Sequence, residues 1–370
     1  MRTLCIVLVC VMFFSSKVTV YGNDSVEELE GYDFSDIDKL LSSEEHEESF
    51  GELFKELIQG DSTDVFKRMF SMVGDKLFGE LSTNKGVIIR IVLLAIGAAL
   101  LSKLSIIFAG SKMSDMGFFA VFSVLMVLLV SAFSFNVKVA TDIVNVLVNF
   151  MKYLIPGFFI AVGAANGITA SLGMYEIAFI SIMAVEYVIL NFVLPAVSVY
   201  VIILIINNIL EEDYLSKFAG VIETVIEWAI KMIPTVALGI NLIASIVLPS
   251  VDYAKSKGYR KLFGLIPGIG TSVDSFVDIV AGSSTLIKNC IGGAALVIII
   301  LLVVLPVVKL LVTCLMYKIT AAIIQPISDK RVTSSVEVMS KGTSMLYRIV
   351  LSCGLMFFLT IGIVCLGTGR

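Results

Sequence analysis

The chain has 370 residues, of which 58% are apolar and only 16% are charged. Soluble domains have about 45–50% apolar and about 25% charged residues, so this composition excludes an ordinary soluble protein and indicates an integral membrane protein. The net charge of −4 is unevenly distributed. Residues 23–60 carry 13 acidic and 2 basic residues, whereas residues 87–370 carry 19 basic and 14 acidic residues. This pattern argues against a nucleic-acid role.

Residues 1–22 are typical of a signal peptide, with an arginine, an apolar run over 4–14 and then small residues. We expect cleavage after Gly22, although an uncleaved anchor would export the following segment equally well. Residues 23–86 then form a short acidic extracytoplasmic segment that is partly helical, because large apolar residues recur at helical spacing only in its second half.

The rest of the chain contains runs long enough to cross a membrane, which takes about 20 apolar residues. We therefore predict an all-α polytopic membrane protein with about 6–8 transmembrane helices, the first two of them within residues 87–150. The clear spans are roughly 88–109, 117–135, 174–210, 233–250, 291–317 and 345–367, and two weaker ones are 153–173 and 262–282.

An internal repeat links the two weaker segments, since both open with the tetrapeptide Leu-Ile-Pro-Gly at an offset of 111 residues. The same offset superposes Pro195 on Pro306. We predict two membrane repeats, 150–250 and 262–367. Three spans in each repeat would make the repeats inverted, whereas re-entrant Pro-Gly segments would make them parallel.

Loop charges predict the orientation, because basic loops favour the cytoplasmic side. Eight spans and an exported head place the basic segments 252–261 and 330–331 inside and the acidic triplet 211–213 outside. Re-entrant segments would still leave the two basic segments on one side of the membrane.

Ionisable residues inside apolar spans usually face a bundle interior, a cavity or each other. Glu186 and Lys309 lie deepest in their spans and are a possible pair. Alternatively, lysines near span ends reach the surface and the aspartates cap a short helix. The candidate intramembrane polar path consists of Glu186, Asp274, Asp278, Lys288 and Lys309. Helix breaks, which line cavities in transporters, are predicted at Pro156, Gly157, Pro195, Pro267, Gly268 and Pro306.

Patterns that carry catalysis or bind metals are absent from the sequence. It contains neither a phosphate-binding GxxxxGK[ST] loop nor an HExxH motif, its single histidine lies in the acidic segment, and its six cysteines lack CxxC spacing. We therefore expect no enzyme activity, no cofactor, no bound metal and no disulfide framework.

Several segments of the C-terminal third resemble one known family. These are Gly264–Gly270, Asp274, Asp278, Leu286–Asn289 and Tyr317–Pro326. They resemble the stage III sporulation protein AE family of endospore-forming Firmicutes. The order of signal peptide, charged exported segment and multispan body also agrees with that family, which offers no catalytic residues to carry over.

The resemblance implies a subunit of the complex that joins mother cell and forespore across their envelopes. It implies a multi-pass protein of the mother-cell membrane surrounding the forespore, with the N-terminal head extracytoplasmic. The implied partners are other membrane proteins of the stage III sporulation operon, including a secretion-type ATPase and ring-forming subunits, and a forespore partner protein.

Three functional hypotheses follow. The chain forms or supports a channel or permease-like conduit needed for late forespore development, it is a non-conducting scaffold that anchors the complex, or it is an independent ion-coupled secondary transporter that uses Glu186 or Asp278. Dense charge inside the spans favours the conduit and the transporter, whereas its concentration at span ends favours the scaffold.

Overall fold

The computed structural model describes residues 112–367 apart from 167, 211–212 and 264–269, together with isolated positions between 86 and 96. The predicted signal peptide and the acidic segment up to residue 85 lie outside the described residues. The described chain is almost entirely helical, which confirms the expected fold class over this range. Its elements are α5 (Lys112–Asn166), α6 (Ile168–Val188), the π-helical turn η3 (Ile189–Val193), α7 (Leu194–Ile209), α8 (Ser216–Phe263), α9 (Gly270–Ile324) and α10 (Lys330–Gly367).

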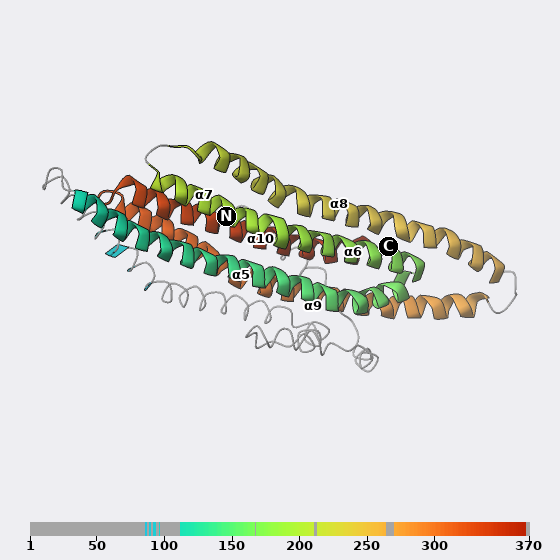
Figure 1. Cartoon of the computed structure of the whole chain (residues 1–370). Coiled ribbons are helices and arrows are strands. Elements are labelled where there is room, and N and C mark those ends of the chain that lie inside the picture. The colour runs from blue at the N-terminus through green and yellow to red at the C-terminus, as the bar shows by residue number, and fades with distance from the viewer. Residues whose placement is uncertain are drawn as a thin grey trace.

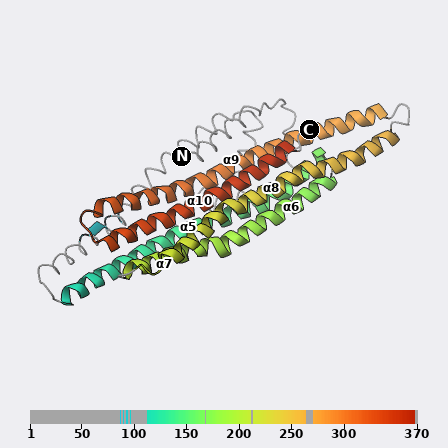
Figure 2. The ribbon, with the colours of Figure 1, turned by 90° about the horizontal axis from the view of Figure 1, so that it is seen from above.

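The helices form one elongated bundle (Figures 1 and 2). α6, η3 and α7 follow a single path, so the described residues make five passes, each antiparallel to the one before it. α10 contacts α5, α7, α8 and α9 and is therefore the central helix. α5 and α9 have 55 residues each, so each extends about 80 Å at about 1.5 Å per residue.

Five helical segments among the described residues are long and apolar enough to cross a membrane, which agrees with a polytopic membrane protein. They are Phe119–Ala164, Ala170–Ile209, Ser216–Leu248, Ile287–Ile324 and Lys330–Cys365.

Predicted spans are joined in two places. The single helix α5 contains the predicted span 117–135 and most of the predicted span 153–173, whose last residues belong to α6. Polar residues such as Lys138 separate these apolar runs, but lysine is a good helix former and the backbone hydrogen bonds continue through it. α9 joins most of the predicted segment 262–282 to the span 291–317 in the same way.

α5 also continues through Pro156 and Gly157, where the sequence predicts a helix break. A proline inside a helix removes one backbone hydrogen bond, and contacts with neighbouring helices can offset this loss. α9 likewise continues through Pro306. α5 instead ends at Asn166, and the antiparallel helix α6 begins at Ile168.

The wider π-helical turn η3 directly precedes Pro195. Proline lacks the N–H that would bond to the preceding turn and its ring crowds the carbonyl there, so a widened turn accommodates it. The remaining predicted breaks, Pro267 and Gly268, lie outside the described residues.

The two basic segments lie at opposite ends of the bundle. Residues 252–261 belong to the last turns of α8, and α9 runs the whole length of the bundle before Lys330 begins α10 at the other end (Figure 1). Both topologies considered from the sequence expect these segments on one side of the membrane, and their placement at opposite ends of the bundle differs from that expectation. The reason is that one uninterrupted helix replaces the additional crossing or re-entrant turn that they require.

Candidate functional site

An ion pair joins α5 to α6 within their apolar stretches. Lys152 Nζ lies 3.0 Å from Glu186 Oε2 and donates a hydrogen bond to Glu186 Oε1 at 3.2 Å. The two side chains are only 29% and 19% exposed. Such pairing reduces the cost of holding charge in apolar surroundings. The partner of Glu186 is therefore Lys152 and not Lys309, the possible partner considered from the sequence.

The two lysines of the predicted polar path that the structure describes lie far from each other. The ammonium group of Lys309 lies 5.6 Å from the centre of the Phe135 ring, a cation–π contact. Lys288 is fully buried and donates a hydrogen bond to the backbone carbonyl of Cys365 at 3.4 Å. The helical rise separates these lysines by about 32 Å along α9, so they do not share one cluster.

The side chains of Asp274 and Asp278, the other two members of that path, lie outside the described residues. Their backbone belongs to the first turns of α9. Whether they join a polar path with Glu186 therefore stays a prediction.

A polar cleft of about 500 Å³ opens at the end of the bundle where α7 and α8 approach the start of α10. Four of its residues on α10 recur at a spacing of three to four and therefore share one face of that helix. They are Lys330, Ser334, Glu337 and Lys341, and the polar residues Asn207, Asn208, Asp213, Ser216, Asp329 and Arg331 also line the cleft.

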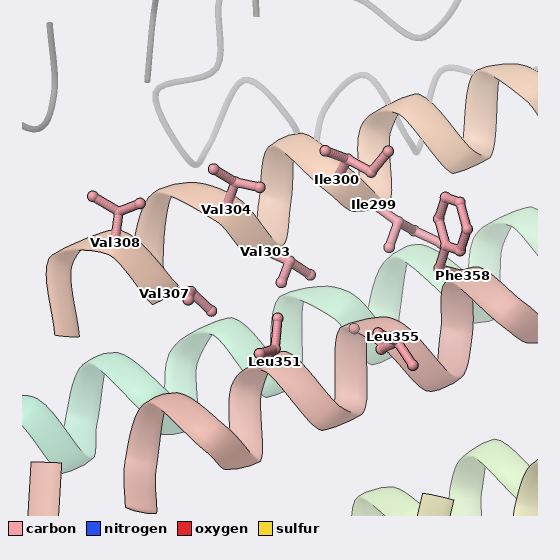
Figure 3. Close-up of a pocket in the computed structure, with 10 residues that line it drawn as sticks. Ile299, Ile300, Val303, Val304, Val307, Val308, Leu351, Leu355 and Phe358 are labelled. Carbon is pink, nitrogen blue, oxygen red and sulfur yellow. The ribbon is translucent and has the colours of Figure 1, made fainter. Parts of the chain in front are cut away.

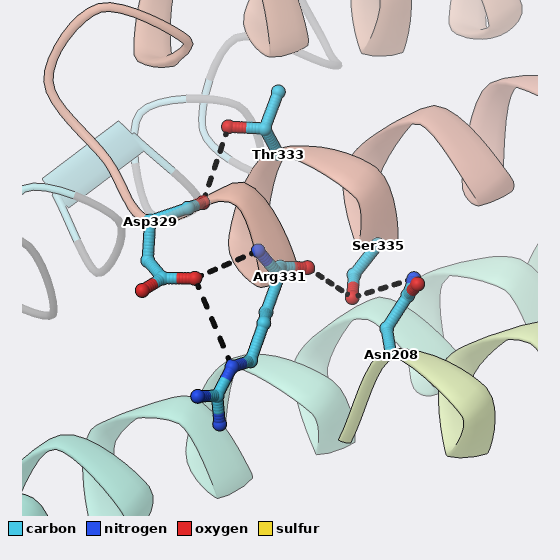
Figure 4. A network of polar contacts seen from close by, with 5 residues as sticks. All are labelled: Asn208, Asp329, Arg331, Thr333 and Ser335. Carbon is cyan, nitrogen blue, oxygen red and sulfur yellow. Dashed lines mark hydrogen bonds and ion pairs between the residues drawn. The ribbon is translucent and has the colours of Figure 1, made fainter. Parts of the chain in front are cut away.

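Polar contacts fix the first turns of α10 at this cleft (Figure 4). Asp329 Oδ1 accepts a hydrogen bond from the Arg331 backbone N–H at 2.8 Å, as an N-cap does, and lies 4.0 Å from Arg331 Nε. The Ser335 hydroxyl donates to the Arg331 carbonyl at 2.7 Å and accepts from Asn208 Nδ2 at 3.2 Å. These contacts hold the end of α7 against α10.

The loop between α7 and α8 is organised by Asp213. Its carboxylate accepts hydrogen bonds from Asn207 Nδ2 and from the Ser216 hydroxyl, each at 2.8 Å, while Asn207 Oδ1 accepts one from the Leu215 N–H at 2.8 Å. The hydrogen bonds from Asn207 and then Ser216 hold the pKa of Asp213 below its ordinary value. This wall of the cleft therefore stays negatively charged at neutral pH.

A second, much smaller cavity of about 60 Å³ lies between α9 and α10 (Figure 3). Apart from Gly354 it is lined by aliphatic side chains and one phenylalanine, including Val303, Leu351 and Phe358. A cavity without polar partners does not hold ordered water and offers no group for chemistry. Within the part of the chain that the structure describes, no group of three His, Cys, Asp or Glu side chains is placed to hold a metal ion.

The geometry therefore combines separately stabilised charges with one polar cleft, and comparison with known proteins adds the family. The family model described as Stage III sporulation protein AE matches residues 48–368. The chain belongs to the stage III sporulation protein AE family. This confirms the resemblance inferred from the sequence. A relative, Stage III sporulation protein AE of Bacillus subtilis (strain 168), is 24% identical over 310 residues, which cover 84% of this chain and 78% of the relative. No solved structure matches.

Sequence reasoning missed several polar contacts of this member of the sporulation family. Lys152 stands at the edge of a predicted span and pairs with a residue 34 positions away. Arg348 Nη1 lies 3.4 Å from Glu227 Oε1 across 121 positions. Neither pair could have been recognised from the sequence. Only residues three or four positions apart on the same helix have a spacing that predicts a contact.

Proposed function

We propose that this chain is a polytopic membrane subunit of the mother cell–forespore transenvelope sporulation complex, and that its bundle supports a conduit needed for late forespore development. Membership in a stage III sporulation family over nearly the whole chain supports the sporulation role. The proposed location is the mother-cell membrane surrounding the forespore, with the acidic segment extracytoplasmic.

The observation that carries the subunit role is the length of the apolar bundle. α5 and α9 extend about 80 Å, whereas the hydrocarbon core of a bilayer is about 30 Å thick. Exposed apolar side chains occur toward both ends, for example Val127 on α5 (71% exposed) and Ile246 on α8 (65%). One bilayer does not cover both, so contacts with other proteins would bury the remainder.

The proposed partners are the other stage III sporulation operon membrane proteins, including the secretion-type ATPase and the ring-forming subunits, and the forespore partner protein. They come from the family resemblance. The exposed apolar surface is compatible with such contacts, since large exposed apolar patches mark protein or membrane interaction sites.

The contacts of the charged side chains inside the bundle favour a bundle that supports a conduit. They argue against a conduit that runs through the bundle itself. Lys152 is paired with Glu186, Lys309 lies over an aromatic ring, and Lys288 is bonded to a backbone carbonyl. Each charge therefore has its own local contact at a separate place. On this proposal the conduit lies between this chain and its partners or further copies.

A conduit through the bundle itself is the second candidate function. The polar cleft of about 500 Å³ favours it, because it brings water and charged side chains into one end of the bundle. On this hypothesis Glu186 and Lys309 continue the path beyond the cleft.

Two substitutions separate these candidates in the spore-forming host. Val127→Asp places a charge on the exposed face of α5 and should reduce both heat-resistant spores and the recovery of co-purified sporulation proteins, whereas Val127→Leu should not. Lys309→Met should leave sporulation nearly normal if the bundle only supports a conduit, and should block late forespore development if the bundle contains it. Normal spores from the Val127→Asp strain, at a normal protein level in the membrane, would contradict the proposed supporting role.

A further inference from the structure

Polar and charged side chains encircle the bundle about halfway along its length. Each of the five described passes contributes to this ring, which we name the charged belt. It consists of Lys138 and Asp142 on α5, Asn191 on η3, Glu227 and Lys231 on α8, Lys309 on α9 and Arg348 on α10.

Contacts around the central helix place three passes of the belt at one level. Arg348 Nη1 lies 3.4 Å from Glu227 Oε1, which joins α10 to α8. Val303 of α9 packs against Gly354 of α10. α9 and α10 are antiparallel, so positions six residues after Val303 and six residues before Gly354 lie at the same level. These positions are Lys309 and Arg348.

The other two passes reach the same level. Asn136 of α5 donates a hydrogen bond to Thr343 of α10 at 3.4 Å, and these helices run in the same direction, so the two α5 members of the belt lie just beyond Thr343. Val201 of α7 packs against Gly342 of α10. α7 runs antiparallel to α10. The turn η3, which precedes α7, therefore lies level with Arg348 and with the helical turn of α10 that follows Arg348.

The distance from the belt to the end of α10, and to the level of Lys288 on α9, matches the thickness of a bilayer core, and α8 and α9 continue beyond that level. The helical rise gives about 32 Å from Lys309 back to Lys288 on α9, and about 29 Å from Arg348 to Gly367 on α10. The hydrocarbon core is about 30 Å thick.

The side chains described on this stretch suit hydrocarbon surroundings. Exposed residues such as Ile180, Ile240 and Ile243 are apolar, and the exposed Asn149 of α5 is an exception. The charged ones are the Lys152–Glu186 pair, the buried Lys288, and Glu176, which lies near the end of the bundle.

The stretch on the other side of the belt is polar on one flank. The cleft of about 500 Å³ runs along α10 from Asp329 to Lys341, and the charged side chains of Lys330, Glu337 and Lys341 are exposed in it. Hydrocarbon does not satisfy such a surface. Large apolar side chains are also exposed on this stretch, among them Val127 of α5, Ile202 of α7 and Leu315 of α9, and the proposed function assigns them to protein contacts.

We propose that the bilayer covers only the part of the bundle between the charged belt and the level of Lys288, with the belt in the headgroup region. The part on the other side of the belt, with the polar cleft, projects into water. Trp228 of α8 is 66% exposed within the belt, and tryptophan is enriched at membrane–water interfaces. This inference rests on the protein contacts of the proposed function but not on the sporulation role. Trp228 is the only tryptophan in the chain.

Tryptophan fluorescence of the reconstituted full-length protein tests the placement without any substitution. The vesicles contain phosphatidylcholine that carries a nitroxide quencher either near the headgroup or near the chain terminus. We expect the shallow quencher to reduce Trp228 emission several-fold more than the deep one. Stronger quenching by the deep label, or none by either, would overturn the proposal.

Two moved tryptophans extend the measurement along the same helix. Trp228→Phe with Ile240→Trp moves the probe about 18 Å toward the proposed bilayer centre, and Trp228→Phe with Phe218→Trp moves it about 15 Å away. Ile240 and Phe218 are both exposed. We expect the deep label to quench the first and neither label to quench the second, and the reverse result would place the bilayer on the other half. Unchanged circular dichroism of each variant establishes that it is folded.

Discussion

Close helix packing around α10 depends on single glycines. At Gly342, a methyl group would collide with Val201 of α7 and Phe133 of α5. We expect Gly342→Ala to destabilise the protein by about 1–3 kcal/mol, the usual cost of overpacking. Gly157 is the matched control, since nothing lies within 4 Å of the added methyl group and helical Gly→Ala changes stabilise by about 0.5–1 kcal/mol. Thermal unfolding in detergent measures both, and equal shifts in Tm for the two variants would contradict this packing.

The Lys152–Glu186 pair permits a double-mutant test at the same scale. Removing one partner leaves the other charge in apolar surroundings, which costs about 3–5 kcal/mol for a fully buried pair and less at this partly exposed one. We expect Lys152→Met to destabilise the protein more than Lys152→Met combined with Glu186→Gln. Lys231→Met is the control, because Lys231 is 73% exposed and such pairs contribute below about 1 kcal/mol. Simple additivity of the two changes would exclude the pair as a stabilising contact.

At the scale of elements, the loop between α7 and α8 should respond to acid. The pKa of Asp213 is lowered in the folded protein by its hydrogen bonds from Asn207 and Ser216. A lowered carboxyl pKa contributes stability that is present above the unfolded value of about 3.9 and is lost as the pH falls through the folded value. Amide exchange of Leu215, corrected for its intrinsic pH dependence, should therefore accelerate below about pH 4. Asp213→Asn should remove that dependence, and an unchanged profile in this variant would assign it to another group.

The sequence predicts which segments are helical wherever a long apolar run occurs. The predicted spans within the described residues are helical, except that 153–173 is divided between the end of α5 and the start of α6. About 20 apolar residues favour a helix that crosses a membrane. Helix ends were less predictable. Lys138 and Pro156 each suggest an interruption of α5, yet neither removes enough backbone hydrogen bonding to end it while α6, α7, α9 and α10 pack along its length.

The candidate polar residues were predictable as types and not as partners. Glu186 and Lys309 stand out because charge is rare in apolar spans. Their contacts, Lys152 and Phe135, come from other parts of the chain and depend on how the five passes are arranged. The polar cleft had no sequence signal for the same reason, since its walls come from the end of α7, the start of α8 and the start of α10.

At the scale of the whole molecule, the order of passes fixes which loops share a side. The α7–α8 loop and the start of α10 lie at one end of the bundle, and the last turns of α8 lie at the other (Figure 1). Under the positive-inside rule, residues 252–261 and the pair Lys330 and Arg331 therefore predict opposite orientations. The first segment carries four basic residues against one acidic residue, whereas the second lies at the same end as Asp213, the last residue of the acidic triplet 211–213. The charge rule thus favours a cytoplasmic location for the end that holds 252–261.

Cysteine labelling tests this arrangement directly. In a background without the six native cysteines, single cysteines at Tyr214, Ser256 and Lys330 are treated with a membrane-impermeant thiol reagent in intact and in lysed cells. Tyr214→Cys and Lys330→Cys should behave alike, because both positions lie at the same end and are exposed. Ser256→Cys should behave in the opposite way, since the whole of α9 lies between it and Lys330. If positions 256 and 330 instead react from the same side, α9 is not one continuous crossing, and the eight-span or re-entrant topology expected from loop charge alone is the correct one.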